Sequence, residues 1–253
     1  MSSSPLPPHS PLEHYYRDRR RDDARREFVI DLFDRTARHY NWLNRVMSFG
    51  SGLRYRREGL ERAGLTAGMR VLDVAVGTGL TAQAALRVTD GLASVTGLDA
   101  SLGMLQEARP LGISLVRAVA EQLPIASRSF DFLSMGYALR HVADLKATFR
   151  EYHRVLRPGG RLVILELTRP SGSRWRYGLM RLYLKRVVPL AAQLGPGGSE
   201  ARTLMEYYWE TIDGCVPPDA VLESLREAGF ERVQRRVFWT VFSEYAATAG
   251  GDN

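Results

Sequence analysis

The sequence contains a single cysteine, Cys215, which excludes an internal disulfide and any metal site built from several cysteines. It also lacks a run of the ~18 consecutive apolar residues that a helix needs to cross a bilayer. Its first residues hold no apolar stretch of the kind found in secretory signals, so no signal is expected. These absences favour a reducing cytoplasm as the setting of the protein.

The composition is that of an ordinary globular protein. The chain has 253 residues, of which 45% are hydrophobic and 25% charged, enough to bury one sizeable core. Collagen-like and wholly disordered classes are excluded. Lys and Arg number 35 against 28 Asp and Glu, a net charge of +7. This excess favours an anionic partner, which the charge alone leaves open as nucleic acid, a membrane face or an acidic ligand.

Three regions follow one another along the chain. Residues 1–25 are rich in Ser, Pro and Arg and are predicted to be a disordered, basic tail. The arginines of this tail are interspersed with acidic residues, which is typical of the solvated start of a helix. A nucleic-acid-binding arm would carry fewer acids. Residues 26–66 show apolar residues at helical spacing and predict a helical extension. Residues 67–249 form the main domain, with a helical insertion at about 171–215.

Short apolar runs alternate with helical stretches in the main domain, which indicates an α/β fold with a parallel sheet covered on both faces. The runs are continuously apolar, as in strands buried on both sides. A helix is expected at 143–156 and a turn at 158–160. We therefore predict one mostly parallel, seven-stranded sheet. Its expected strands are residues 69–76, 94–99, 113–118, 130–137, 161–167, 231–238 and 240–247.

A glycine loop, Gly77-Thr78-Gly79, follows the first expected strand, and Asp99 closes the second. Ligands of open α/β sheets bind at the carboxyl ends of the strands, where glycines allow a close approach and helix starts offer free N–H groups. An acid at the position of Asp99 can accept hydrogen bonds from both hydroxyls of a ribose. Ser101 is suited to cap the helix that follows.

The loop is neither a dinucleotide fingerprint nor a phosphate-binding P-loop. Asp73, just before it, would repel a pyrophosphate but suits a cationic amine. A ligand with a ribose and an ammonium group but no phosphate is S-adenosylmethionine. The alternative is a tight turn between strand and helix that binds no ligand.

Further motifs narrow the identification. They are Phe33-Asp34, Ala37, Tyr40, Asn44, Met47–Gly50, Val71–Ala75 with Gly77–Gly79, Ala120–Pro124, Phe130-Asp131, Leu139-Arg140 with Val142, Arg154–Leu162 with Glu166, and Ala228–Phe230. In this order they resemble class I S-adenosylmethionine-dependent methyltransferases. More closely, residues 27–248 resemble the ubiquinone/menaquinone C-methyltransferase family (the UbiE/MenG/COQ5 group). The resemblance implies a Rossmann-like fold and methyl transfer to a hydrophobic aromatic acceptor.

Several positions depart from that family. Val76 stands where Gly is usual, Leu80 where Asp is usual, and Val119 where an acid or Asn is usual. His141 replaces an Asn, and residues 206–218 differ from the equivalent segment of the quinone enzymes. These departures leave the cofactor assignment intact and keep the acceptor open.

The resemblance and the loop pattern together define an expected cofactor site. Asp73 would hold the methionine end of the cofactor, Met104 would pack on the adenine, and Ala120 and Glu121 would bond its edge. Plain core packing is the alternative for Met104. No ligand cluster for a metal is present, and none is required. The expected cofactor-binding residues are Asp73, Ala75, Gly77, Thr78, Gly79, Asp99, Ala100, Met104, Ala120, Glu121 and Tyr137.

Three residues are expected to act on the acceptor. The resemblance points to Arg140, which would stabilise a quinolate or organise proton removal through a water, because an Arg stays protonated. His141 is better suited as a base by its ordinary pKa. Tyr40 matches a family position near the acceptor. The alternatives are an Arg140 ion pair with an acid such as Glu166 or Asp131, a His141 bonded to backbone at a helix start, and a Tyr40 packed in the core.

Residues 174–186 carry five cations, no acid and much apolar bulk. Such a segment is suited to bind an anionic membrane surface, here the inner membrane face, where the enzyme would take up a hydrophobic acceptor from the bilayer. It also suits packing on its own domain or on a second subunit of a homodimer. No single-strand platform supports nucleic-acid binding.

The expected function is C-methylation of a hydrophobic aromatic acceptor, with a prenylated quinol as the leading candidate. One alternative is methylation of a polyketide-like or other secondary metabolite. Another is a non-catalytic cofactor-binding scaffold of a membrane-bound biosynthetic complex.

Overall fold

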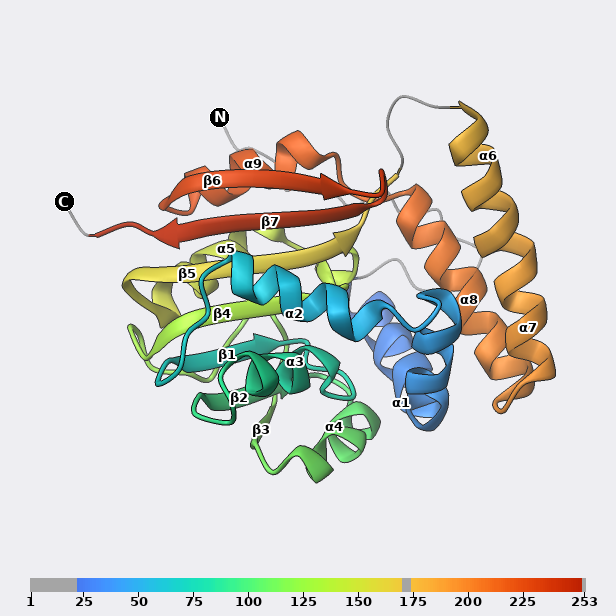
Figure 1. The fold of residues 1–253 in the computed structure, drawn as a ribbon, viewed down its shortest axis with the longest axis horizontal. Helices are drawn as coiled ribbons and strands as arrows, with labels where there is room; N and C mark the ends of the chain where they lie inside the picture. The colour runs from blue at the N-terminus through green and yellow to red at the C-terminus, as the bar shows by residue number, and fades with distance from the viewer. Residues whose placement is uncertain (1–21, 170–173, 252–253) are drawn as a thin grey trace.

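The computed structural model describes residues 22–169 and 174–251. It contains the strands β1 (Arg70–Val74), β2 (Ser94–Asp99), β3 (Ser114–Arg117), β4 (Phe130–Gly136), β5 (Leu156–Leu167), β6 (Phe230–Phe238) and β7 (Phe242–Ala249). They form one sheet of seven strands in the order β3-β2-β1-β4-β5-β7-β6 (Figure 1). Strands β1 to β5 pair in parallel, and β7 pairs antiparallel with both of its neighbours, β5 and β6. The predicted seven-stranded, mostly parallel sheet is confirmed.

The strand order reverses between β1 and β4. From β1 the chain moves outward through β2 and β3, then returns to the other side of β1 with β4. Such a reversal leaves a crevice at the carboxyl ends of the two central strands, the usual place for a ligand in this kind of sheet.

Helices cover both faces of the sheet, because successive strand residues point to opposite sides. On one face, α2 (Gly52–Arg62), α3 (Leu80–Val88) and α4 (Leu102–Ala108) pack on side chains such as Val71 and Val163. Helices α5 (Leu145–Val155) and α9 (Pro218–Glu227) pack on the other, against side chains such as Leu72 and Ile164. In Figure 1, α2 and α3 lie in front of the sheet.

A third apolar cluster lies beyond the strand ends, where α1 (Asp22–Met47) packs against α7 (Val188–Leu194) and α8 (Gly198–Asp213) through residues such as Leu43 and Leu204. α6 (Arg174–Leu182) continues through one π-helical turn, Tyr183–Val187, into α7. The two helices form a column at the right-hand edge of Figure 1. α1 begins inside the segment predicted as tail, and residues 1–21 lie outside the described residues.

The predicted turn at residues 158–160 is part of β5 instead. The pairing of β4 with β5 shifts from Phe130–Leu156 to Phe132–Arg161, so the intervening residues bulge out of the strand. Gly159 has a φ of 77°, which a bulge accepts without ending the strand. In the described part of the chain, no helix is both long and apolar enough to cross a membrane.

Candidate functional site

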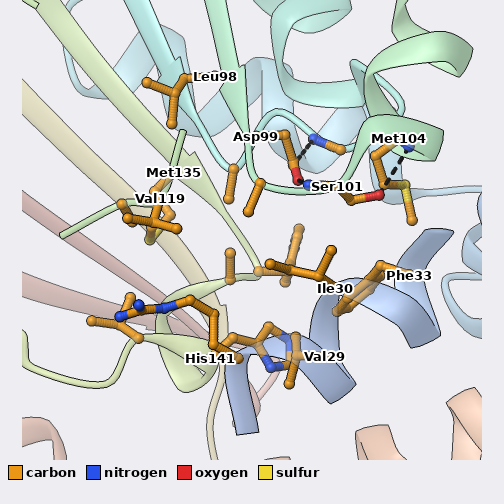
Figure 2. A pocket seen from close by; sticks show the side chains of 18 of the residues that line it. Val29, Ile30, Phe33, Leu98, Asp99, Ser101, Met104, Val119, Met135 and His141 are labelled. Atoms are coloured by element: carbon orange, nitrogen blue, oxygen red, sulfur yellow. Dashed lines mark hydrogen bonds between the residues drawn. The ribbon is translucent and has the colours of Figure 1, made fainter. Parts of the chain in front are cut away.

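A pocket opens at the carboxyl ends of β1, β2 and β4, where the strand order reverses. We call it the strand-end pocket (Figure 2). Of the residues expected to bind a cofactor, it is lined by Ala75, Gly77, Asp99, Ala100, Met104, Ala120, Glu121 and Tyr137. Of the residues expected to act on an acceptor, it is lined by Tyr40 and His141.

Asp99 organises the floor of this pocket. Its Oδ2 accepts a hydrogen bond from the Gly77 amide at 2.8 Å, and its Oδ1 accepts one from the Ser101 amide at 2.9 Å (Figure 2). Burial raises the pKa of Asp99, and the two amides oppose that rise by favouring the carboxylate. A Cβ added at Gly77 would meet no atom within 4 Å, so the backbone of the loop is open to a ligand.

The predicted Ser101 cap is present and places Met104. The Ser101 hydroxyl accepts a hydrogen bond from the Met104 amide at 3.1 Å, at the start of α4. Asp34 of α1 accepts hydrogen bonds from the Ser101 hydroxyl and, at 2.8 Å, from the Gly103 amide. These bonds hold α1 against α4, so Phe33 and its neighbours on α1 close one side of the pocket (Figure 2).

Asp73, Thr78 and Gly79 do not line the pocket. The fully buried Asp73 accepts a hydrogen bond from the Ser134 hydroxyl at 2.7 Å, while its Oδ2 has no partner. Burial raises the pKa of Asp73 to about 7, although Ser134 and the charge of Arg56 oppose the rise. Thr78 donates a hydrogen bond to Asn41 of α1 at 2.6 Å, and Gly79, with a φ of 87°, is the N-cap residue before α3. The three residues lie behind the wall of the pocket and shape it.

The unusual Val76 also points away from the pocket. It is buried and packs on Gly97 of β2, since a Cβ at Gly97 would lie only 2.9 Å from its Cγ2. Neither Val76 nor Leu80 lines the pocket, whereas Val119 does. The departures from the family pattern at Val76 and Leu80 therefore do not alter the lining of the pocket.

A second, larger space of about 680 Å³ adjoins the first; we call it the aromatic cavity. Tyr40, Tyr137 and Tyr208 line both spaces and so form the wall between them. The other aromatic residues that line the cavity are Phe49, Tyr55, Tyr183, Trp239 and Phe242.

Arg140 lines the aromatic cavity and not the strand-end pocket. Its Nη1 lies 2.5 Å from Glu166 Oε1 and also donates to the Tyr137 carbonyl at 2.8 Å. Burial, the largest single effect, would lower the pKa of Arg140, but the Glu166 carboxylate together with the surrounding tyrosines raises it above the ordinary value. Glu166 is thus the acid paired with Arg140, while Asp131 binds Arg157 at 2.7 Å.

His141 and Tyr40 both contact the tyrosines of α8. His141 Nδ1 is hydrogen-bonded to the Tyr207 hydroxyl at 2.7 Å, and the two rings stack with centroids 5.3 Å apart. The Tyr208 hydroxyl donates to the Tyr40 hydroxyl at 3.0 Å, and the Arg140 guanidinium lies over the Tyr208 ring. The three residues expected to act on an acceptor therefore gather around one wall.

Sequence reasoning missed Tyr208 and Arg56. Tyr208 lies in segment 206–218, which the sequence marked only as a departure from the family. Arg56 is one of four arginines in α2, and no sequence signal separates it from Arg54 or Arg57. Only the fold reveals that Arg56 is buried in the aromatic cavity.

The strand-end pocket fits the expected cofactor, S-adenosylmethionine. A partly buried carboxylate at the end of β2 suits ribose hydroxyls, the open backbone at Gly77 admits a close ligand, and apolar Met104 and Val119 suit an adenine ring. Asp73, which was expected to hold the methionine end of the cofactor, is fully buried and is not among the residues that line the pocket.

Comparison with known proteins agrees with this geometry. Residues 20–242 match the model of the ubiE/COQ5 methyltransferase family. The chain is 34% identical over 218 residues to a demethylmenaquinone methyltransferase of Thermotoga maritima, covering 85% of this chain and 93% of the relative. It is 30% identical over 223 residues to a ubiquinone/menaquinone biosynthesis C-methyltransferase of Campylobacter jejuni, covering 85% and 94%.

A solved structure shares the fold. It is a SAM-dependent methyltransferase, possible histamine N-methyltransferase, from Thermotoga maritima, with a TM-score of 0.62 at 18% identity, covering 87% of this chain and 99% of that chain. The chain therefore belongs to the ubiE/COQ5 methyltransferase family and is an S-adenosylmethionine-dependent methyltransferase.

Proposed function

We propose that this enzyme methylates a ring carbon of a prenylated hydroquinone, a precursor of ubiquinone or menaquinone. The aromatic cavity carries the proposal, because it is large, rich in aromatic side chains and separated from the cofactor pocket only by Tyr40, Tyr137 and Tyr208. The names of the relatives, a ubiquinone/menaquinone biosynthesis C-methyltransferase and a demethylmenaquinone methyltransferase, support the same acceptor class.

The rim of the cavity suits an acceptor with a long apolar chain. Phe49 and Trp239 line the cavity and yet are 82% and 86% exposed, so they stand at its mouth. Exposed aromatic side chains of this size mark surfaces that meet apolar partners. A ring bound inside the cavity would leave its prenyl chain to pass between them.

Bound S-adenosylmethionine supplies an electrophilic methyl group on a sulfonium, which becomes a neutral thioether when the acceptor carbon forms its new bond to the methyl. The protein's main contribution is to align the acceptor carbon with that methyl in an enclosed site. We assign this alignment to Tyr40 and Tyr208, which are joined by a hydrogen bond in the wall. Burial raises the pKa of Tyr208 well above the ordinary value, so it acts as a neutral donor and not as a base.

Two proton transfers complete the reaction. The acceptor hydroxyl loses a proton to solvent water before attack, and the methylated ring carbon loses its own proton to a base of the protein afterwards. His141 is the base that we propose for the ring proton, because it lies on the wall of the strand-end pocket and Tyr207 fixes its ring. Asp99 would bind the cofactor ribose, and Ala75, Gly77, Ala100, Met104, Ala120, Glu121 and Tyr137 would form the remaining cofactor contacts.

We also propose that the enzyme works at an anionic membrane surface, where such an acceptor resides. Helix α6 and the π-helical turn expose Leu179, Leu182, Lys185 and Arg186, and no acid occurs from Arg174 to Ser199. This pattern of exposed apolar and basic side chains is that of a helix lying on anionic lipid.

Two measurements test the acceptor. The purified enzyme is incubated with S-adenosylmethionine and a short-chain demethylmenaquinol kept reduced by dithionite, and the product is identified by mass spectrometry. A product one methylene heavier, with the new methyl on a ring carbon, is expected. Lipid extracts of a strain that lacks this gene should accumulate a quinone one methylene lighter. An unchanged quinone pool together with no product in vitro would overturn the proposal in favour of a non-quinone acceptor.

A further inference from the structure

The aromatic cavity contains two buried arginines that differ in their partners. Arg140 is paired with the Glu166 carboxylate, so its charge is neutralised. Arg56 of α2 is 3% exposed and has no carboxylate within 4 Å among the described residues. A buried cation is unfavourable unless an anion or a set of acceptors compensates it.

The contacts of Arg56 compensate it only in part. Its Nη1 donates to the Gly52 carbonyl at 3.0 Å and approaches Asn44 Oδ1 at 3.5 Å, and both of these acceptors are neutral. Its Nε is buried and has no hydrogen-bond partner. The guanidinium therefore retains unused donor capacity at the lining of the cavity, and its charge is offset only at longer range, by the Asp73 carboxyl.

Arg56 also lies close to the wall between the two spaces. Its guanidinium carbon is 4.6 Å from the centroid of the Tyr137 ring, which faces both the cavity and the strand-end pocket. An acceptor ring placed against this wall, with its carbon toward the cofactor, would have its oxygen within the cavity that Arg56 lines.

We infer that Arg56 binds the oxyanion of the ionised acceptor hydroxyl and is the cation that makes the acceptor ring nucleophilic. The ligand class is a phenolate, hydroquinonate or enolate oxygen. An anion in the cavity would compensate the buried charge of Arg56, which has no ion pair among the described residues, whereas Arg140 already has its anion in Glu166. Arg140 then holds the wall through Glu166, Tyr137 and Tyr208.

The inference rests on the proposed function, but its first test needs no turnover. The probe is 4-nitro-1-naphthol, which changes absorbance on ionisation, bound to the enzyme saturated with S-adenosylhomocysteine. We expect its apparent pKa to fall by about one unit or more in the wild-type site, the size of shift that a nearby opposite charge produces. An unshifted or raised pKa on the wild-type enzyme would overturn the inference, even if the quinol is methylated.

Variants supply the second test. Arg56→Gln should return the probe pKa toward its value in water and lower kcat/KM for the quinol by about 10²-fold, as when one oxyanion donor is removed. In Arg56→Gln the acidic limb of the pH–rate profile should move to higher pH. In Arg56→Lys, which keeps a positive charge, that limb should return most of the way to its wild-type position. Arg57→Gln is the matched control: it is exposed, one position along α2, and paired with Glu61.

A purely structural role for Arg56 has a different signature. It would lower the melting temperature and weaken cofactor binding in Arg56→Gln while leaving the pH–rate limb and the probe pKa in place. That result would overturn the inference and leave the proposed acceptor standing. Conversely, a shifted probe pKa on an enzyme that does not methylate the quinol would refute only the acceptor.

Discussion

Arg140 and Glu166 form a buried ion pair beside the aromatic cavity. The Arg140 Nη1 and Glu166 Oε1 atoms are 2.5 Å apart, and their side chains are 1% and 0% exposed. Glu166 also accepts hydrogen bonds from the Arg140 and Leu167 amides. Because the two charges neutralise each other, the pair contributes little net charge to the cavity. Its main effect is to hold the two side chains in place.

Breaking the pair should therefore destabilise the fold as well as lower activity. Arg140→Ala leaves the Glu166 carboxylate buried without its cation, and we expect a loss of about 3–5 kcal/mol in the free energy of unfolding, measured by urea denaturation. Turnover should fall while cofactor affinity is kept, because Arg140 does not line the strand-end pocket.

The double variant Arg140→Met with Glu166→Leu separates the two effects. Replacing both charges with apolar side chains should recover most of the lost stability without recovering turnover. Full turnover in the double variant would mean that the pair only supports the fold and that its place beside Tyr208 has no bearing on catalysis.

Asp99→Ala should weaken cofactor binding strongly. The substitution removes the acceptor for the ribose hydroxyls and releases the Gly77 and Ser101 amides that shape the pocket. Hydrogen bonds to a charged group contribute about 1.5–3 kcal/mol each, so the Kd for S-adenosylmethionine should rise on the order of 10²-fold or more. Isothermal calorimetry measures this, with the exposed Glu223→Ala of α9 as the control. Equal Kd values for both variants would remove Asp99 from the proposed cofactor site.

Burial of Asp73 makes stability depend on pH. Its pKa rises from 3.8 to about 7 in the folded protein, so between these values the native state binds a proton that the unfolded chain releases. Stability then falls as pH rises from about 4 to 7, by up to about 4 kcal/mol for this group.

Asp73→Asn should cancel that dependence. The asparagine does not titrate, so the stability of the variant relative to wild type should increase from pH 4.5 to about pH 7 and then level off, whatever constant cost its amide adds. Urea denaturation across this range measures it. Asp90→Asn changes the same charge at an exposed turn residue and should show no such trend. A flat difference for Asp73→Asn would indicate that the carboxylate has a cation partner in the folded state.

Val76 and Gly97 should behave as a matched pair. In Gly97→Ala the new Cβ would lie 2.9 Å from Val76 Cγ2 and 3.1 Å from Leu115 Cδ2, and such overpacking costs about 1–3 kcal/mol. Val76→Ala should relieve it, so the double variant should be more stable than the sum of the single effects predicts. Additive losses in urea denaturation would show that the two side chains do not compete for one space.

Much of the fold follows from patterns that the sequence displays directly. Continuous apolar runs separated by helical stretches predict buried parallel strands, and all seven strands are present. Position 158–160 misleads because Pro and Gly indicate a turn, and whether that turn ends a strand or bulges within it depends on the pairing with β4. Pairing is a tertiary property.

The site is only partly predictable for the same reason. Asp99 and Gly77 follow from their place after strands, whereas Arg56 resembles its neighbours in α2 until burial distinguishes it. No sequence pattern indicates that Val76 packs on Gly97, because this contact joins the loop after β1 to strand β2, about twenty residues further along the chain. Burial and long-range contact are the properties that one sequence does not reveal.

Membrane binding through α6 and the π-helical turn is the last expectation. The wild-type enzyme should bind vesicles that contain phosphatidylglycerol and not vesicles of phosphatidylcholine alone, and added salt should weaken the binding. Each cation at such a surface contributes about 1 kcal/mol, so Lys185→Gln with Arg186→Gln should lower affinity about 30-fold. The matched control is Arg57→Gln with Arg87→Gln, two exposed arginines of α2 and α3 that make the same change in net charge. Co-sedimentation with vesicles measures both.

If the two double variants lose affinity equally, the attraction is a property of net charge alone. If the wild type ignores anionic vesicles and the Lys185/Arg186 variant changes the sedimentation coefficient, this face contacts a second copy of the chain and the membrane proposal fails.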